Sequence, residues 1–225
     1  SPVAVGALKP NHRLEGGHEV RVLLERLLEH VARLLVLALL VLHDAEPVEN
    51  LRDFVAPERV AGMAVDSTCC SVVALGPDGE PLRPALIWMD RRAEAESVAL
   101  REQFGTEFIE TVTGNRADPF YVASKILWYR THEPDKFANT YLFLQVNGYI
   151  NYRLSGKFSL DPVHADLLQL RDWKAHKWSP ALCEACGVEP YHFPPVHPGH
   201  HILGEITSQA AEATGLAPGT PVMVG

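Results

Sequence analysis

Short apolar runs alternate with helix-like segments from residue 60 to the end of the chain, and this alternation most limits the fold. Runs typical of strands lie at 60–66, 71–75, 85–89 and 141–146, and the last residues of PGTPVMVG begin another. Segments typical of helices lie at 92–104, 120–130, 148–154, 178–187 and 208–214. Strands that alternate with helices predict an α/β domain whose sheet is covered by helices.

The first 60 residues have a different character. Residues 19–43 form one long helical pattern, with leucines at three- and four-residue spacing on one face. Its most apolar part, Leu34 to Leu42, falls well short of the roughly 20 residues that cross a bilayer, so we expect a buried helix and no membrane anchor. The sequence therefore predicts an atypical, largely helical segment over 1–60 and a separate domain over 61–225.

Composition and charge restrict the partners of the chain. Of 225 residues, 47% are hydrophobic, which is an ordinary globular balance. The net charge of -8 gives no basic surface for nucleic acid, so a small neutral or weakly charged ligand fits better. The four cysteines and the lack of a recognisable secretory leader favour a reducing cytoplasm.

Four stretches, in the same order, resemble the N-terminal domain of FGGY carbohydrate kinases, the group that includes glycerol kinase, xylulokinase and ribulokinase. They are AGMAVDSTCCSVVALGPDGEPL, ALIWMDRRA, DPFYVASKILW with the later YLFLQVNGYINYRLSG, and SLDPVHADLLQLRDWKAHKWS. The resemblance implies an actin-like, ribonuclease H-like fold and a sugar-binding half of a two-domain kinase. Because the chain stops within a strand pattern, we expect the natural polypeptide to continue into the second, nucleotide-binding domain, which this incomplete fold lacks.

The resemblance also bears on the substrate. In DSTCCS, Thr68 and Cys69 occupy the place where glycerol kinase carries an Arg-Glu pair, and the segment looks more like ribulokinase-type members. A pentulose such as ribulose or xylulose is therefore favoured over glycerol. The family's opening phosphate loop, which is rich in glycine and threonine, has no counterpart in residues 1–60.

Asp161 matches the catalytic aspartate of the family, which receives the proton when a sugar hydroxyl attacks the γ-phosphate of ATP. It stands in SLDPVHA, where a loop or strand end is expected. The alternative for an aspartate before a proline is a plain turn residue.

Trp88, Asp90 and Arg91 lie in the stretch where similar enzymes contact the sugar. An indole face packs against the apolar C–H face of a sugar, and a carboxylate accepts its hydroxyl protons. The alternatives are that Trp88 belongs to the core and that Asp90 caps the helix expected from Arg92.

Three further residues are weaker candidates for sugar contact. Phe120 falls where a relative places an aromatic side chain against its substrate, although core packing is the stronger interpretation. Asp66 and Thr68 follow a predicted strand, and strand ends of α/β folds line ligand crevices.

A metal-binding module is the main competing class. Cys183 and Cys186 precede several histidines, and two cysteines with a histidine pair can hold zinc. The cysteines lie inside a predicted helix, however, which favours buried thiols and no metal site.

The resemblance as a whole implies an ATP-dependent sugar kinase that uses magnesium, with a small-molecule sugar as its partner and a homodimer left open. This chain alone is then expected to be inactive. A catalytically inert sugar-binding or interaction domain is the alternative.

Overall fold

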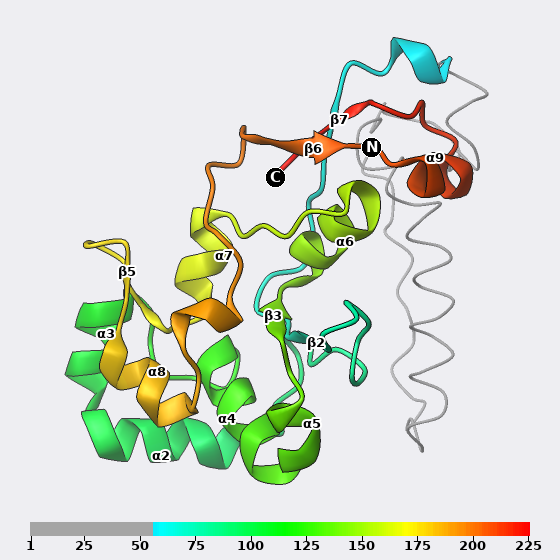
Figure 1. Cartoon of the computed structure of the whole chain (residues 1–225). Helices are drawn as coiled ribbons and strands as arrows, with labels where there is room; N and C mark the ends of the chain where they lie inside the picture. Colours follow the sequence, from blue (N-terminus) through cyan, green and yellow to red (C-terminus); the bar gives the residue numbers. More distant parts are fainter. Residues whose placement is uncertain (1–55) are drawn as a thin grey trace, which may run out of the picture.

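Three small groups of strands organise the part of the chain that the structure, a computed structural model, describes, which is residues 56–225 (Figure 1). In the three-stranded sheet, β7 (Pro221–Met223) lies between β1 (Met63–Ala64), to which it is parallel, and β6 (Ile202–Glu205), to which it is antiparallel. The antiparallel pair β2 (Val73–Leu75) and β3 (Leu142–Leu144) is buried along its whole length. The third group is the hairpin of β4 (Arg171–Asp172) and β5 (Lys177–Trp178).

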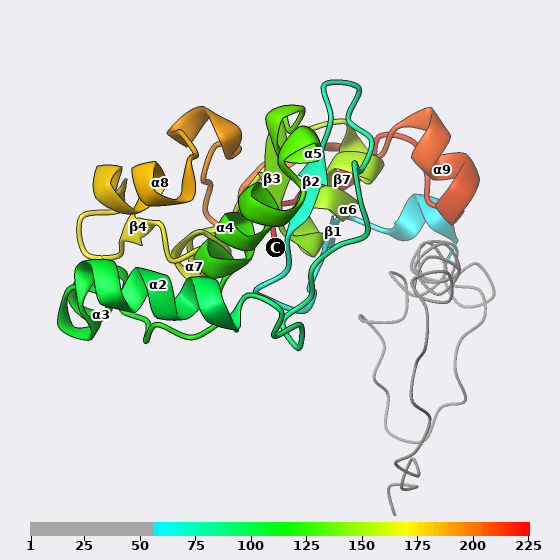
Figure 2. The ribbon, with the colours of Figure 1, turned by 90° about the horizontal axis from the view of Figure 1, so that it is seen from below.

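Helices separate these strands along the chain. They are α2 (Glu94–Phe104), α3 (Thr106–Thr113), α4 (Val122–His132), α5 (Pro134–Ala138), α6 (Val146–Ser155), α7 (Pro162–Leu167), α8 (Pro180–Cys186) and α9 (Ser208–Thr214), with 3-10 turns η3 (Pro57–Arg59) and η4 (Pro190–His192). Helices α2, α3 and α8 lie at one end and α9, beside the three-stranded sheet, at the other, as both views show (Figures 1 and 2).

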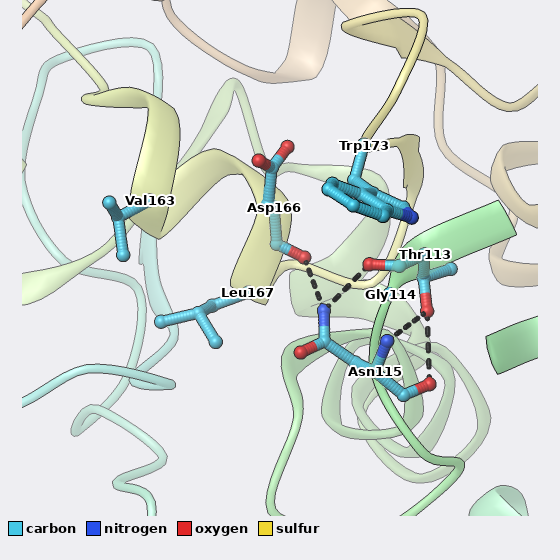
Figure 3. A pocket seen from close by; sticks show the side chains of 7 residues that line it. All are labelled: Thr113, Gly114, Asn115, Val163, Asp166, Leu167 and Trp173. Atoms are coloured by element: carbon cyan, nitrogen blue, oxygen red, sulfur yellow. Dashed lines mark hydrogen bonds between the residues drawn. The ribbon is translucent and has the colours of Figure 1, made fainter. Parts of the chain in front are cut away.

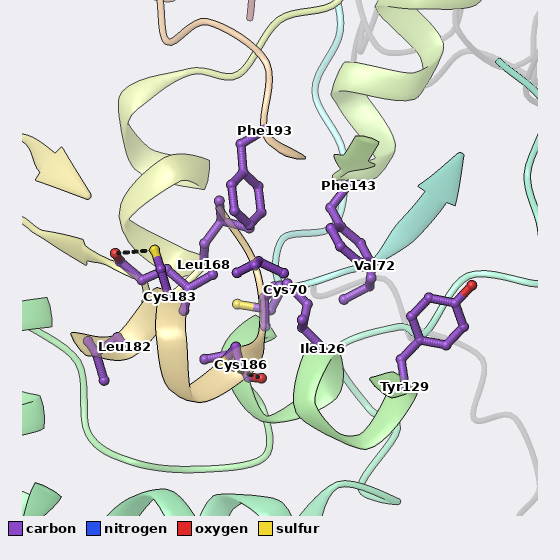
Figure 4. Close-up of a cluster of buried hydrophobic side chains, with 14 of the residues drawn as sticks. Cys70, Val72, Ile126, Tyr129, Phe143, Leu168, Leu182, Cys183, Cys186 and Phe193 are labelled. Atoms are coloured by element: carbon purple, nitrogen blue, oxygen red, sulfur yellow. Dashed lines mark hydrogen bonds between the residues drawn. The ribbon is translucent and has the colours of Figure 1, made fainter. Parts of the chain in front are cut away.

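The largest core lies at the end formed by α2, α4 and α8. It contains apolar side chains from these helices together with Cys70, Val72, Phe143, Leu160 and Phe193 (Figure 4). A second core joins the three-stranded sheet to α6 and α9 through Ile150, Leu154, Ala210, Ala211 and Val222. Helix α6 thus belongs to the second core while β3, which leads directly into it, packs in the first.

Most predicted elements of residues 61–225 are confirmed. The strands expected at 60–66, 71–75 and 141–146 are present as the shorter β1, β2 and β3, the final strand is β7, and the five predicted helices are α2, α4, α6, α8 and α9. Sequence reasoning missed α3, α5, α7, β6 and the β4–β5 hairpin. The predicted helix at 19–43 lies outside the described residues.

The strand predicted at 85–89 is wrong. Only Leu86 makes a bridge, to Val72, and the chain then turns, with the Asp90 main-chain nitrogen donating to the Ile87 carbonyl at 3.0 Å. Trp88 and Met89 are 41% and 60% exposed, so this apolar run faces outward instead of lying between two layers.

No helix among residues 56–225 is long and apolar enough to cross a membrane.

Candidate functional site

Asp161 lies at the N-terminus of α7, where its side chain caps the helix and Pro162 occupies the first turn. The preceding residue is tied to a neighbouring segment: the Leu160 nitrogen donates to Pro195 at 3.1 Å, and its carbonyl accepts from His197 at 2.9 Å. Asp161 is therefore a strand-end residue that starts a helix, and only 4% of it is exposed.

Both carboxylate oxygens of Asp161 accept hydrogen bonds. Oδ1 accepts from the main-chain nitrogen of His164 at 2.9 Å. Oδ2 lies 2.6 Å from Nδ1 of His164 and accepts from Nδ2 of Asn147 at 3.0 Å. Burial alone would raise the pKa of Asp161, but the bonds and charge of His164, with the Asn147 amide, outweigh it and hold that pKa below its ordinary value. The carboxyl is therefore ionised at neutral pH.

Asn147 connects Asp161 to the loop that follows β1. Its main-chain nitrogen donates to Oγ of Ser67 at 3.0 Å, while its side chain reaches Asp161. The predicted residues Asp66 and Thr68, on either side of Ser67, are exposed. The structure thus brings the Asp66–Thr68 loop and Asp161 together through a residue that motif reasoning did not identify.

Three buried polar atoms around Asp161 have no hydrogen-bond partner within residues 56–225. They are Oε1 of Gln145, Oδ1 of Asn147 and Nε2 of His164. Their residues are themselves linked, because Nε2 of Gln145 donates to the His164 carbonyl at 2.6 Å and Asn147 meets His164 at Asp161. Since a buried polar atom without a partner costs about 1–3 kcal/mol, the cluster is suited to a polar ligand or water.

Trp88 and Phe120 form a second group at the start of α4. Their rings meet edge to face with centroids 6.0 Å apart, and Phe120 packs in the same way against Tyr121 at 5.2 Å. The core interpretation of Trp88 is wrong, because 41% of it is exposed. Phe120 is half-buried and touches the main core, so it supports Trp88 from below.

Asp90 and Arg91 flank this aromatic pair and already have protein partners. The Asp90 carboxylate accepts from the main-chain nitrogen of Arg92 at 3.1 Å and from its Nε at 2.9 Å, although the N-cap residue of α2 is Ala93. Burial would raise the pKa of Asp90, but these Arg92 bonds lower it overall. Arg91 is exposed and pairs with Glu94 at 2.9 Å and Asp118 at 3.5 Å.

Lys125 lies fully buried beneath the second group. Its Nζ donates to the carbonyls of Pro119 and Phe120 at 2.6 and 2.5 Å. Burial lowers the pKa of this amine to about 8, against weaker opposing effects of Cys70, Asp90 and Asp118. Lys125 thus fixes the turn that carries Phe120.

The predicted residues therefore fall into two groups. One contains Asp161 and the Asp66–Thr68 loop, and the other contains Trp88, Asp90, Arg91 and Phe120. Among residues 56–225 no hydrogen bond or ring contact joins Trp88 to Asp161. Sequence reasoning missed Asn147, His164 and Lys125; the His three residues after a helix-capping Asp was a usable signal, because that spacing returns its side chain to the cap.

A hollow of about 290 Å³ lies next to α7, lined by Thr113, Gly114, Asn115, Val163, Asp166, Leu167 and Trp173 (Figure 3). The Trp173 ring covers the turn at Gly114, where a Cβ would lie 3.1 Å from it. Asn115 holds this wall by donating from Nδ2 to the Asp166 carbonyl at 3.1 Å. None of the predicted site residues lines this hollow.

The competing zinc site has no geometric support. Cys183 and Cys186 lie in the main core, where Sγ of Cys186 donates to the Ala123 carbonyl at 3.5 Å (Figure 4). Burial raises the pKa of these thiols to about 11 and about 12. Within residues 56–225 no three His, Cys, Asp or Glu side chains are grouped to hold a metal ion.

Comparison with known proteins identifies the class and then the family. The fold is that of actin-like, ribonuclease H-like sugar kinases: xylulose kinase from Rhodospirillum rubrum matches with a TM-score of 0.69 and 31% identity, over 72% of this chain and 33% of that one. Residues 45–225 match the model of the FGGY family of carbohydrate kinases, N-terminal domain. The chain belongs to this family, as its motifs indicated.

Curated relatives agree with this family. The chain is 28% identical to xylulose kinase of Bacillus subtilis over 80% of its own length and 37% of the relative's. It is 30% identical to autoinducer-2 kinase of Escherichia coli over 76% of its length and 32% of the relative's. The chain thus spans about a third of the length of these relatives.

Proposed function

We propose that this chain supplies the sugar-binding side of an ATP-dependent carbohydrate kinase, with Asp161 as the group that receives the proton of the attacking hydroxyl. The observation that carries the proposal is the buried, ionised carboxylate of Asp161 beside three polar atoms that lack partners among the described residues. A hydroxyl-rich ligand would supply those partners.

In the proposed reaction, a sugar hydroxyl oxygen forms a bond to the γ-phosphorus of ATP and the bond from that phosphorus to the β-γ bridging oxygen breaks. The hydroxyl proton passes to Asp161. A carboxylate with a lowered pKa is a weak base, but the loose transition state of phosphoryl transfer needs little prior deprotonation of the nucleophile. Asp161 would therefore act mainly by orienting the hydroxyl and taking the proton late.

Magnesium is expected with ATP, but residues 56–225 contain no cluster suited to hold it. We therefore assign no step to a metal held by these residues. Trp88 and Phe120 would form an apolar wall for the sugar, with Asp90 and Arg91 at its edge, and Asp66 and Thr68 would border the Asp161 side.

A pentulose is the proposed substrate class. The DSTCCS segment supports it, as do two relatives named xylulose kinase, from Bacillus subtilis and Rhodospirillum rubrum. Autoinducer-2 is a second candidate because a relative named for it is 30% identical to this chain.

The test is ATP-dependent phosphorylation of xylulose, ribulose, glycerol and autoinducer-2 by the natural polypeptide that carries this chain. Asp161→Asn should lower kcat at least a thousandfold and leave sugar binding within a few fold, because the amide keeps the shape and loses the proton acceptor. Asp135→Asn, an exposed carboxylate of α5, is the matched control and should change neither. Near-normal turnover by Asp161→Asn would refute the assignment.

A further inference from the structure

We propose that His164 uses its two ring nitrogens on two different partners: Nδ1 fixes the carboxylate of Asp161, and Nε2 accepts a hydrogen bond from a hydroxyl of a neutral sugar. This inference rests on the proposed function. It adds to it a residue that both positions the base and binds the substrate, and it narrows the substrate class.

The Nδ1 role follows from the contacts of one residue with both oxygens of Asp161. The main-chain nitrogen of His164 lies 2.9 Å from Oδ1 and its Nδ1 lies 2.6 Å from Oδ2. An ionised carboxylate can only accept, so Nδ1 must carry the hydrogen. Nδ2 of Asn147 donates to the same Oδ2, which explains why it comes within 3.4 Å of Nδ1. The carboxylate is thus held in one plane and one orientation.

The Nε2 role follows from the same hydrogen assignment. When Nδ1 carries the hydrogen of the neutral ring, Nε2 carries a lone pair and is an acceptor. Nε2 is buried and has no partner among residues 56–225. A buried acceptor in this state calls for a donor from a ligand or a water.

Two neighbouring atoms are acceptors for the same kind of reason. Nδ2 of Asn147 donates to Asp161 and Nε2 of Gln145 donates to the His164 carbonyl, so the remaining amide atoms, Oδ1 and Oε1, are oxygens. Both are buried and unpartnered within the described residues. Three acceptors next to an ionised carboxylate favour a ligand that offers hydroxyl donors and disfavour an anion. A neutral ketose fits this set better than a sugar acid such as gluconate.

Two substitutions separate the two nitrogens. In His164→Asn the side-chain amide nitrogen takes the place of Nδ1 and nothing replaces Nε2. In His164→Gln the longer side chain reaches the place of Nε2 and the place of Nδ1 is lost. For His164→Asn we expect kcat within about threefold of the parent and a sugar KM raised at least tenfold. For His164→Gln we expect kcat lowered at least tenfold with a smaller change in KM.

The pH profile distinguishes positioning from a merely structural role. Besides His164, the ionised group nearest in effect to Asp161 is Asp166, whose carboxylate pairs with Arg171 at 3.0 Å. Loss of Nδ1 leaves burial as the dominant influence on the Asp161 pKa, so the acidic limb of kcat should move to higher pH in His164→Gln. In His164→Asn that limb should stay close to the parent position.

Two measurements do not depend on kinase activity and separate this inference from the proposed function. Carbon-13 NMR of the full chain should report a higher titration point for the Asp161 carboxyl in His164→Gln than in the parent. Nitrogen-15 NMR of the unsubstituted chain should report a shift of the His164 Nε2 resonance on addition of D-xylulose, little shift of Nδ1, and no response to gluconate at equal concentration.

Each outcome decides one claim. If Asp161→Asn retains turnover, the proposed function fails while the NMR titration still tests the contact between Asp161 and His164. If the Asp161 carboxyl titrates alike in the parent and in His164→Gln, the Nδ1 role is wrong. If xylulose leaves Nε2 unchanged, or gluconate shifts it equally, the Nε2 role is wrong, and this result does not depend on whether either variant folds.

Discussion

The Cα of Gly148 faces the main-chain carbonyl of Ser159 so closely that a Cβ at position 148 would lie 2.7 Å from that oxygen. Gly148 follows Asn147 in α6, and Ser159 lies two residues before Asp161. Glycine therefore sets the distance between the helix that carries Asn147 and the segment that carries Asp161. The hydrogen bond between these two residues depends on this close approach.

Gly148→Ala should weaken both folding and the site. The carbonyl belongs to the main chain and cannot turn aside, so α6 and the Ser159 segment must separate, which costs about 1–3 kcal/mol of overpacking strain. Urea unfolding should report this loss, and kcat should fall more than the sugar KM changes. Gly62→Ala is the control, because a Cβ there meets its nearest atom at an ordinary 3.5 Å. Equal stabilities of the two variants would contradict the argument.

Local patterns were enough to predict the α/β class and most elements, because apolar periodicity reports burial within a few residues. The same rule failed at residues 85–89, where a turn exposes Ile87 and Met89 although the run looks like a buried strand. Motif resemblance identified Asp161. It could not identify the contact of Asn147 with Ser67, which joins positions 80 residues apart, since only tertiary packing creates such a contact.

Trp88→Ala should raise the sugar KM at least fivefold with little change in kcat or stability. The indole is 41% exposed and contacts Phe120 through a ring edge, so its removal takes away a binding wall and leaves the core intact. Trp173→Ala is the matched control, because Trp173 is 43% exposed and lines the separate hollow by α7. A KM increase confined to Trp173→Ala would place the sugar in that hollow.

Cys183 and Cys186 should behave as inert core thiols. Because burial raises their pKa values to about 11 and about 12, they stay protonated at pH 8 and should react with Ellman's reagent only when the chain unfolds. Cys69, which is half-buried, should react first. Elemental analysis of purified chain and melting curves with and without added zinc test the metal alternative, and stoichiometric zinc with a raised Tm would revive it.

Lys125 should leave a signature in the pH dependence of stability. Its pKa is about 8 in the folded chain, below the 10.5 of an ordinary lysine, so the unfolded chain holds more protons between these pH values. Deprotonation therefore favours the folded state, and the free energy of unfolding should rise across this window by up to roughly 3 kcal/mol from this group. Urea unfolding of the parent and of Lys125→Met from pH 7 to 10.5 isolates the effect, since other titrations cancel in the difference. The difference should widen with pH in favour of the parent, whereas Lys136→Met, at a half-exposed position, should follow the parent curve. A constant difference between parent and Lys125→Met would mean that the buried ammonium keeps its proton throughout this range.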